Sequence, residues 1–119
     1  MSFEPTRSPI QFTMPSGKLA FWCMKVQAAF TQAFVLKDKS GTTIASNQGN
    51  GSGTFQTTNG PFTITITANG NPSSVLFSST ALLNAGAVKE ETFVFASEDA
   101  GDGDYNDCFL TITWFQSAG

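Results

Sequence analysis

The sequence contains no histidine, only two cysteines and few charged residues. The lack of histidine excludes His-ligated zinc, a Ser-His-Asp triad and a Cys-His nucleophile. Charged residues make up 13% of the chain, which is about half of the usual share. Six Lys and Arg against nine Asp and Glu argue against a surface for nucleic acid. No apolar run approaches the roughly 20 residues that a membrane-spanning helix needs, so we expect no membrane insertion.

The two cysteines, Cys23 and Cys108, are too few for a disulfide scaffold. Each lies within an apolar run, so we expect two buried, reduced thiols, while one disulfide between them is the alternative that the sequence leaves open. The first residues lack the basic start and the apolar stretch of a secretory signal. We therefore expect a chain made in the cytoplasm without a classical signal peptide, and an extracellular or cell-surface location would require an unconventional route.

What the sequence does contain is a regular pattern of short strands. The 119 residues, of which 40% are hydrophobic, suit one domain spanning residues 1–119 with a real core. In Pro61–Ala68, apolar side chains alternate with threonines from Phe62 onward, and Asn69-Gly70 is a strong turn signal. Further strands are expected at Ile10–Met14, Lys18–Val26, Thr31–Lys37, Thr42–Ser46, Gly53–Thr57, Ser74–Ser79, Thr92–Ser97 and Cys108–Phe115. Only Thr80–Lys89 leans toward a helix. This pattern predicts an all-β sandwich or barrel.

Most aromatic side chains fall on these strand patterns, and we expect them in the core. The phenylalanines concerned are Phe21, Phe34, Phe62, Phe77, Phe93, Phe95 and Phe109. Trp22 is out of phase with Phe21, which points to a place at the surface or at an oligomer interface. Cys23 and Met24 are expected in the core, and Lys25 is expected to face solvent.

The acidic residues are concentrated in one loop between two apolar strands. Five of the nine acids fall within ten residues, while the rest of the chain carries six basic and four acidic residues. These five are Glu98, Asp99, Asp102, Asp104 and Asp107. Their oxygens are hard ligands of the kind that Ca²⁺ prefers, whereas softer metals would favour His or Cys. The cluster predicts a calcium site, and two adjacent Ca²⁺ ions would bring the five carboxylates close to charge balance.

The same residues are compatible with other interpretations of this loop. Asp102-x-Asp104-x-Asn106 resembles the start of an EF-hand, but the sixth position is Asp107 instead of Gly and the twelfth is Thr113 instead of Glu. A solvated acidic turn and a purely structural calcium site are alternatives. A glycosidase would need two carboxyl groups facing each other across a cleft, and no second acidic cluster faces this one, so we expect no enzyme activity.

The segment Ser97-Glu98-Asp99-x-x-Asp102-x-Asp104-Tyr105-Asn106-Asp107, followed by an apolar strand that ends in Trp114, resembles the bacterial calcium-mediated lectins that bind fucose and mannose. Thr67–Ser73 and Phe12–Pro15 are similar to that family's Asn-Gly turn region and its N-terminal strand. The resemblance implies an antiparallel β-sandwich of about nine strands of the Greek-key type. It also implies two Ca²⁺ ions, a sugar that completes both coordination shells, and a homodimer or higher homo-oligomer.

The resemblance also implies a role for each residue of the motif. Glu98 and Asp102 would bind one ion, Asp104 and Asp107 would bridge both ions, and Asn106 would serve the second. Asp99 would accept hydrogen bonds from sugar hydroxyls. The sugar-binding residues that this implies are Glu98, Asp99, Gly101, Asp102, Asp104 and Asp107, together with Ala28 and Ala29 of an earlier loop. Physically, hydroxyls of a vicinal diol can replace calcium-bound water, and nearby carboxylates can accept their protons in charge-assisted hydrogen bonds.

Three positions depart from the family pattern. Gln27 stands where the family has a calcium-ligating Asn, so its side chain is longer by one methylene. Ala28-Ala29 resembles mannose-preferring members, and the Phe30 that follows is bulkier than usual. The chain ends in Gly119, two residues later than expected and without the usual Pro, and the family's terminal carboxylate ligates a neighbour's calcium. We expect a lectin for mannose- or fucose-type monosaccharides, with a calcium-stabilised structural sandwich that has lost sugar binding as the alternative.

Overall fold

The computed structural model describes residues 6–98 and 105–117, and within them every regular element is a strand. The strands are β1 (Thr6–Arg7), β2 (Ile10–Phe12), β3 (Leu19–Val26), β4 (Gln32–Lys37), β5 (Thr43–Gln48), β6 (Gly51–Gln56), β7 (Phe62–Ala68), β8 (Asn71–Pro72), β9 (Ser74–Asn84), β10 (Ala87–Glu98) and β11 (Cys108–Phe115). β1 and β8 have two residues each, and the other nine are longer. The predicted all-β sandwich of about nine strands is confirmed.

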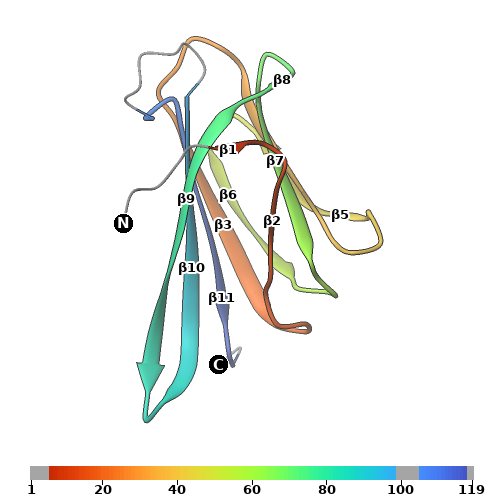
Figure 1. Cartoon of the computed structure of the whole chain (residues 1–119), viewed down its shortest axis with the longest axis vertical. Helices are drawn as coiled ribbons and strands as arrows, with labels where there is room; N and C mark the ends of the chain where they lie inside the picture. Colours follow the sequence, from red (N-terminus) through yellow and green to blue (C-terminus); the bar gives the residue numbers. More distant parts are fainter. Residues whose placement is uncertain (1–5, 99–104, 118–119) are drawn as a thin grey trace.

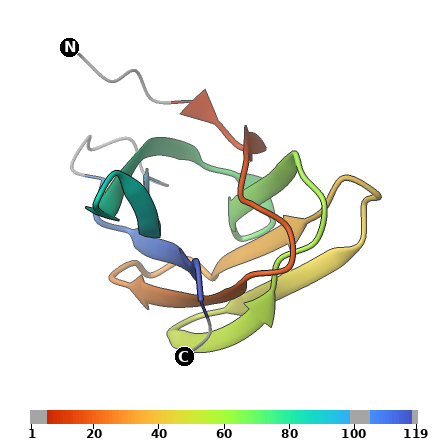
Figure 2. The ribbon, with the colours of Figure 1, turned by 90° about the horizontal axis from the view of Figure 1, so that it is seen from below.

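The strands form two antiparallel sheets that pack face to face (Figures 1 and 2). The larger sheet has the order β1-β9-β10-β11-β3-β6, and the smaller has the order β2-β7-β4-β5, with β8 paired to β7. β10 and β11 are the strands that flank the acidic segment. Their register runs without a break from Glu90↔Phe115 to Ser97↔Cys108. The acidic segment is therefore held at both ends by one continuous ladder.

The core lies between the two sheets and follows the alternation in the sequence. In β7, Phe62, Ile64 and Ile66 are buried and the threonines between them are half-buried. Phe12 from β2 lies near the middle of an aromatic cluster, with its ring centroid 4.8 Å from that of Phe93. Tilted and edge-on ring contacts of this kind add to the stabilisation from burial alone. The core thus fixes the ends of β10 and β11 from the inner side.

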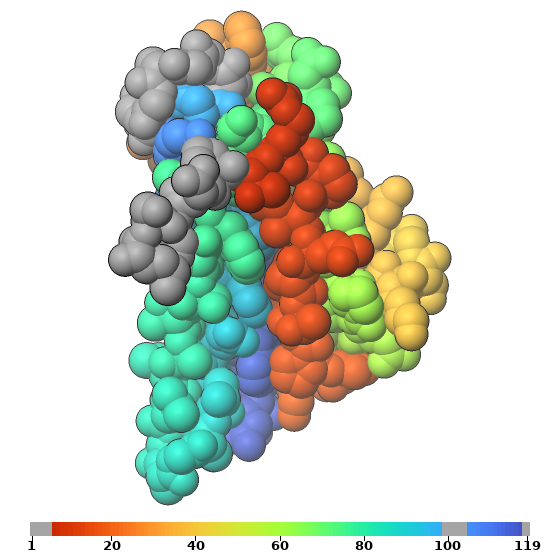
Figure 3. Space-filling model, viewed as in Figure 1, coloured from red at the N-terminus to blue at the C-terminus, as the bar shows by residue number. Residues whose placement is uncertain are grey.

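The stretch Thr80–Lys89 is not helical, which makes that expectation wrong. It forms the distal part of the β9–β10 hairpin, which projects beyond the neighbouring strands (Figures 1 and 3). Asn84 pairs with Ala87, and Ala85 and Gly86 form the turn with φ values of 53° and 81°. Two consecutive positive φ values are typical of a two-residue hairpin turn. Three apolar residues of this hairpin, Leu82, Leu83 and Val88, are exposed. Because they are apolar, the sequence of the hairpin lacks the alternation of polar and apolar residues that would indicate strands.

The facing of β3 differs from our expectation at Phe21, Trp22 and Cys23 and agrees with it at Met24. Trp22 and Met24 are buried, whereas Phe21 is 38% exposed and Cys23 is also exposed. Nearly every residue of Leu19–Val26 is apolar, so alternation could not indicate which set faces inward, and a shift by one residue exchanges the two faces. The Trp22 ring packs edge-on against Phe34 at 5.2 Å.

The other expectations for the core are confirmed except at Phe109. Phe34, Phe62, Phe93 and Phe95 are buried and Phe77 packs partly buried against the core, as expected, while Phe109 is 47% exposed on the outer face. Lys25 is exposed, as expected.

The cysteines lie on opposite faces of two paired strands, where Cys23 of β3 pairs with Thr111 of β11 and Cys108 pairs with Val26. Both thiols are free, so the disulfide alternative is wrong. The expectation of burial is confirmed for Cys108 only.

Candidate functional site

The site that the sequence predicts lies where β10 ends and β11 begins. Glu98 is the last residue of β10, and Asp107 directly precedes β11. The antiparallel ladder brings them together, because Ser97 pairs with Cys108 and the Asp107 N–H donates to the Ser97 carbonyl at 3.2 Å. Both acidic residues are buried, with relative exposures of 7% and 8%. Two neighbouring carboxylates are thus withdrawn from most of the solvent at one end of the sandwich.

The residues between these acids are partly described. The backbone N–H of Tyr105 donates to Glu98 Oε1 at 3.2 Å, which orients the carboxylate from the loop side. Tyr105 has a φ of 53°, a conformation that is uncommon for a bulky residue and that is often found at functional sites. Asn106 is exposed. The predictions for Asp99, Gly101, Asp102, Asp104 and Gly119 lie outside the described residues.

The loop between β3 and β4 adjoins the acidic segment. The backbone N–H of Gln27 donates to the Asp107 carbonyl at 3.0 Å, so the position expected to supply a ligand is tied directly to one of the acidic residues. Gln27 and Ala29 are exposed and Ala28 is half-buried. On the strand side, the Val26 N–H donates to Asn50 Oδ1 at 2.7 Å. The structure therefore brings the predicted early loop to the same end of the molecule as Glu98 and Asp107.

A turn from the smaller sheet closes the other side of this loop. The Thr31 N–H donates to Asn69 Oδ1, and the Asn69 N–H donates to the Thr31 carbonyl, each at 2.8 Å. Asn69 has a φ of 49°, which Asn tolerates better than most residues. The sequence predicted the Asn69-Gly70 turn but gave no sign of the contact to Thr31, since the two residues are far apart along the chain. The sequence also did not predict the hydrogen bonds from the Val26 N–H to Asn50 and from the Tyr105 N–H to Glu98. The only signal for them was the residue type of Asn50, whose amide oxygen is an acceptor.

Two acidic residues, Glu98 and Asp107, are buried at this end of the sandwich. Burying a carboxylate is costly unless opposite charge or hydrogen bonds compensate, and no Lys or Arg follows Lys89 in the sequence. Among the described residues, no group of three or more His, Cys, Asp or Glu gathers in one place, and three further acids of the motif fall within 99–104. The oxygen ligands of Glu98 and Asp107, buried side by side, fit the chemistry of Ca²⁺.

Cys108 lies directly behind the two acids and does not take part in this chemistry. The pKa of the Cys108 thiol is raised to about 11, chiefly by burial, while the Ser97 hydroxyl lowers it and the negative charge of Asp107 raises it. A thiol with this pKa is protonated at neutral pH, and soft metals bind the thiolate. Cys108 is therefore part of the packing under the site.

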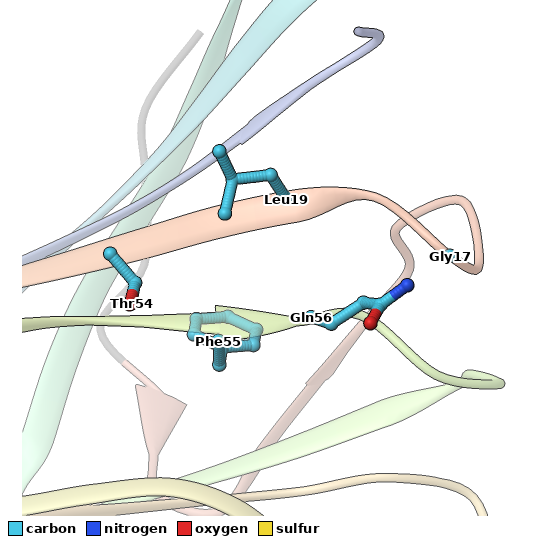
Figure 4. A pocket seen from close by; sticks show the side chains of 5 residues that line it. All are labelled: Gly17, Leu19, Thr54, Phe55 and Gln56. Atoms are coloured by element: carbon cyan, nitrogen blue, oxygen red, sulfur yellow. The ribbon is translucent and has the colours of Figure 1, made fainter. Parts of the chain in front are cut away.

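A groove at the opposite end of the molecule holds none of the predicted site residues. Its volume is about 440 Å³, and it is lined by Gly17, Leu19, Thr54, Phe55 and Gln56 from the turn before β3 and from β6 (Figure 4). It carries no charged side chain, and it lies at the start of β3, whereas the acidic segment adjoins its end. The groove is separate from the candidate site.

Comparison with known proteins identifies the family of this chain. The model of the family described as fucose-binding lectin II (PA-IIL) matches residues 12–116. The lectin CV2L of Chromobacterium violaceum, solved with alpha-methyl-fucoside, is 27% identical with a TM-score of 0.73 and covers 90% of this chain and 96% of its own. The high-affinity mannose-binding lectin of Ralstonia solanacearum is 25% identical with the same TM-score and coverage.

The C-terminal domain of the BC2L-C lectin from Burkholderia cenocepacia shares the fold at 21% identity, with a TM-score of 0.77, covering 94% of this chain and 100% of that domain. No curated protein matches the chain. The family match extends over nearly all of the described residues and includes both the acidic segment and the loop after β3. The chain belongs to the fucose-binding lectin II (PA-IIL) family.

Proposed function

We propose that this protein is a calcium-dependent lectin without enzyme activity that binds mannose- or fucose-type monosaccharides. The observation that carries the proposal is the burial of Glu98 and Asp107 side by side at the end of the β10–β11 ladder, within a chain of the PA-IIL family. Two structural relatives are described by their fucoside complex and by their mannose binding. A buried carboxylate is stabilised by hydrogen bonds and by positive charge, and a Ca²⁺ ion bound by the oxygen-rich motif would supply such a charge.

The proposed site holds two Ca²⁺ ions. The ligand set comprises Gln27, Glu98, Asp102, Asp104, Asn106 and Asp107, with the carboxylate of Gly119. When bound, calcium supplies a hard positive charge to which vicinal hydroxyls of a sugar coordinate. The protein contributes the rest: Glu98 and Asp107 are held by the ladder, and Asp99 and the remaining carboxylates accept hydrogen bonds from the coordinated hydroxyls.

The loop after β3 is proposed to set the preference among sugars. Ala28 and Ala29 offer no hydroxyl to the sugar, and their small side chains favour a mannose-type ligand over fucose, in line with the family pattern. The hydrogen bond from Gln27 N to the Asp107 carbonyl fixes the start of this loop, so the extra methylene of Gln27 extends from an anchored backbone.

Titration calorimetry with mannose and with fucose tests the proposal. In excess calcium we expect both sugars to bind, mannose more tightly, and a chelator should abolish binding. Glu98→Gln should weaken calcium and sugar binding at least tenfold, because an amide lacks the charge that balances the cation. Glu90→Gln, on the outer face of the same strand, is the matched control and should bind like the parent chain.

Two outcomes would contradict the proposal in different ways. Sugar binding that persists in excess chelator would refute calcium-mediated recognition. If neither sugar bound in excess calcium while calcium still raised the melting temperature, the structural sandwich that has lost sugar binding would be the better account.

A further inference from the structure

One exposed aromatic side chain is placed at the candidate site and has no role in the ligand set above. Phe30 lies in the connection between β3 and β4 and is 45% exposed. The residues before it, Ala28 and Ala29, are small, so Phe30 is the only large side chain between Gln27 and Thr31. Among the described residues, the other exposed large hydrophobic side chains lie on strands, either on the outer face of the larger sheet or in the β9–β10 hairpin.

The backbone around Phe30 is fixed on both sides. Three residues earlier, the Gln27 N–H donates to the Asp107 carbonyl at 3.0 Å. One residue later, Thr31 exchanges two hydrogen bonds of 2.8 Å with Asn69. Consecutive Cα atoms are 3.8 Å apart, so the Cα atom of Phe30 lies at most about 11 Å from that of Gln27. Phe30 therefore stands on the rim of the candidate site on a segment that is anchored to one of its acidic residues.

We infer that Phe30 forms an apolar subsite beside the sugar site and selects glycosides that carry an apolar, preferably aromatic, group next to the sugar. This inference rests on the proposed lectin function and adds to it the class of glycoside that is preferred. An exposed ring on an anchored backbone loses little conformational freedom on binding, and a flat apolar group can cover its face. The calcium site supplies the main attachment of the sugar, and Phe30 contributes only where the ligand extends past the sugar ring.

The test compares two ligands that share one sugar, methyl α-mannoside and phenyl α-mannoside. Their affinities are measured by titration calorimetry in excess calcium for the parent chain and for Phe30→Ala. We expect the parent chain to prefer the phenyl glycoside by about three- to tenfold, the size of one aromatic contact. Phe30→Ala should lose this preference and bind methyl α-mannoside like the parent chain.

Two further variants make the result specific. Phe30→Tyr keeps the ring and should keep the preference for the phenyl glycoside. Leu83→Ala removes an exposed apolar side chain of the hairpin at the other end of β9 and β10 and should leave both affinities unchanged. Circular dichroism establishes that each variant is folded.

Failure of the inference differs from failure of the proposed function. If the parent chain and Phe30→Ala bind both glycosides with the same ratio of affinities, Phe30 forms no subsite although the protein is a lectin. If the parent chain binds neither glycoside in excess calcium, the lectin function itself is refuted, and the inference with it.

Discussion

At the residue scale, the candidate site depends on side chains whose partners are distant in the sequence. Asn69 is an example, since its side chain accepts a hydrogen bond from the Thr31 N–H while its backbone adopts a φ of 49°. Both properties favour Asn: the amide oxygen is an acceptor, and Asn tolerates the left-handed region. Asn69 thereby joins the β7–β8 turn to the loop that carries Gln27 and Phe30, and it ties the smaller sheet to a site built mainly on the larger one.

Replacing Asn69 by Ala should weaken both the fold and the site. The variant leaves the Thr31 N–H without its acceptor and replaces Asn by a residue that tolerates the left-handed region less well, so we expect a loss of about 1–2 kcal/mol in the free energy of unfolding. It should also lower the affinity for sugar, because the loop after β3 loses one of its two anchors. Urea denaturation and calorimetry measure the two effects.

Two neighbouring substitutions control this experiment. Asn69→Asp keeps an acceptor oxygen and tolerance of the left-handed region, and should lie close to the parent chain in stability. Asn71→Ala, at an exposed position on β8, should change neither quantity by much. An Asn69→Ala variant as stable as the parent chain would show that the hydrogen bond to Thr31 contributes nothing measurable.

At the element scale, the facing of β3 decides what the larger sheet presents on each side. Trp22 faces inward across from Gly53 of β6, and a Cβ atom added to Gly53 would lie 2.7 Å from Trp22 Nε1. The glycine thus makes room for the indole ring. The buried Trp leaves Phe21 for the outer face, where its ring centroid is 5.4 Å from that of Phe115.

Gly53→Ala should therefore destabilise the protein. The added methyl group must displace the buried Trp22 ring, and overpacking of this kind typically costs about 1–3 kcal/mol. Ser52→Ala, at the adjacent exposed position on β6, is the control and should be within about 0.5 kcal/mol of the parent chain. Chemical denaturation followed by tryptophan fluorescence measures both. Equal stability of the two variants would contradict the inward position of Trp22.

The sequence predicted those elements in which polar and apolar residues alternate, and it failed where they do not. β7 alternates apolar residues with threonines; its facing agrees with the structure, and its predicted bounds agree to within one residue. β3 is apolar on both faces, so its position was predicted and its facing was not. The distal hairpin offers no alternation beyond Thr80, and its turn depends on positive φ values at Ala85 and Gly86.

The candidate site, too, was predicted from the sequence only in part. The acidic motif is local, and its residues Glu98 and Asp107 could be found from the clustering of acidic residues along the chain. Their burial follows from the ladder, which cannot be read from the motif. The contacts of Gln27 with Asp107 and of Thr31 with Asn69 join segments that are distant in the sequence, and local pattern carries no information about such pairs.

At the scale of the whole molecule, the outer face of the larger sheet suits a second copy of the chain. Leu19, Phe21 and Phe109 on β3 and β11 are 39%, 38% and 47% exposed, and they belong to paired strands. Leu19 and Phe21 lie toward the start of β3, while Phe109 lies beside Lys25 near its end. Exposed apolar side chains on a sheet face are typical of an interaction site. β11 leads from the acidic segment at Cys108 to Phe115 near the chain end, about 23 Å away at 3.3 Å per residue.

We propose a homodimer in which this face packs against its own copy with the strands reversed, so that each chain end approaches the partner's acidic segment. The double variant Phe21→Ser and Phe109→Ser should then sediment as a monomer at concentrations where the parent chain is a dimer. It should also bind immobilised mannose more weakly than the parent chain, because linked sites gain from effective concentration. Leu82→Ser and Leu83→Ser in the hairpin form the control and should leave the dimer intact. A parent chain that is monomeric at all concentrations would refute the dimer, whereas a hairpin variant that dissociates would place the interface on the β9–β10 hairpin instead.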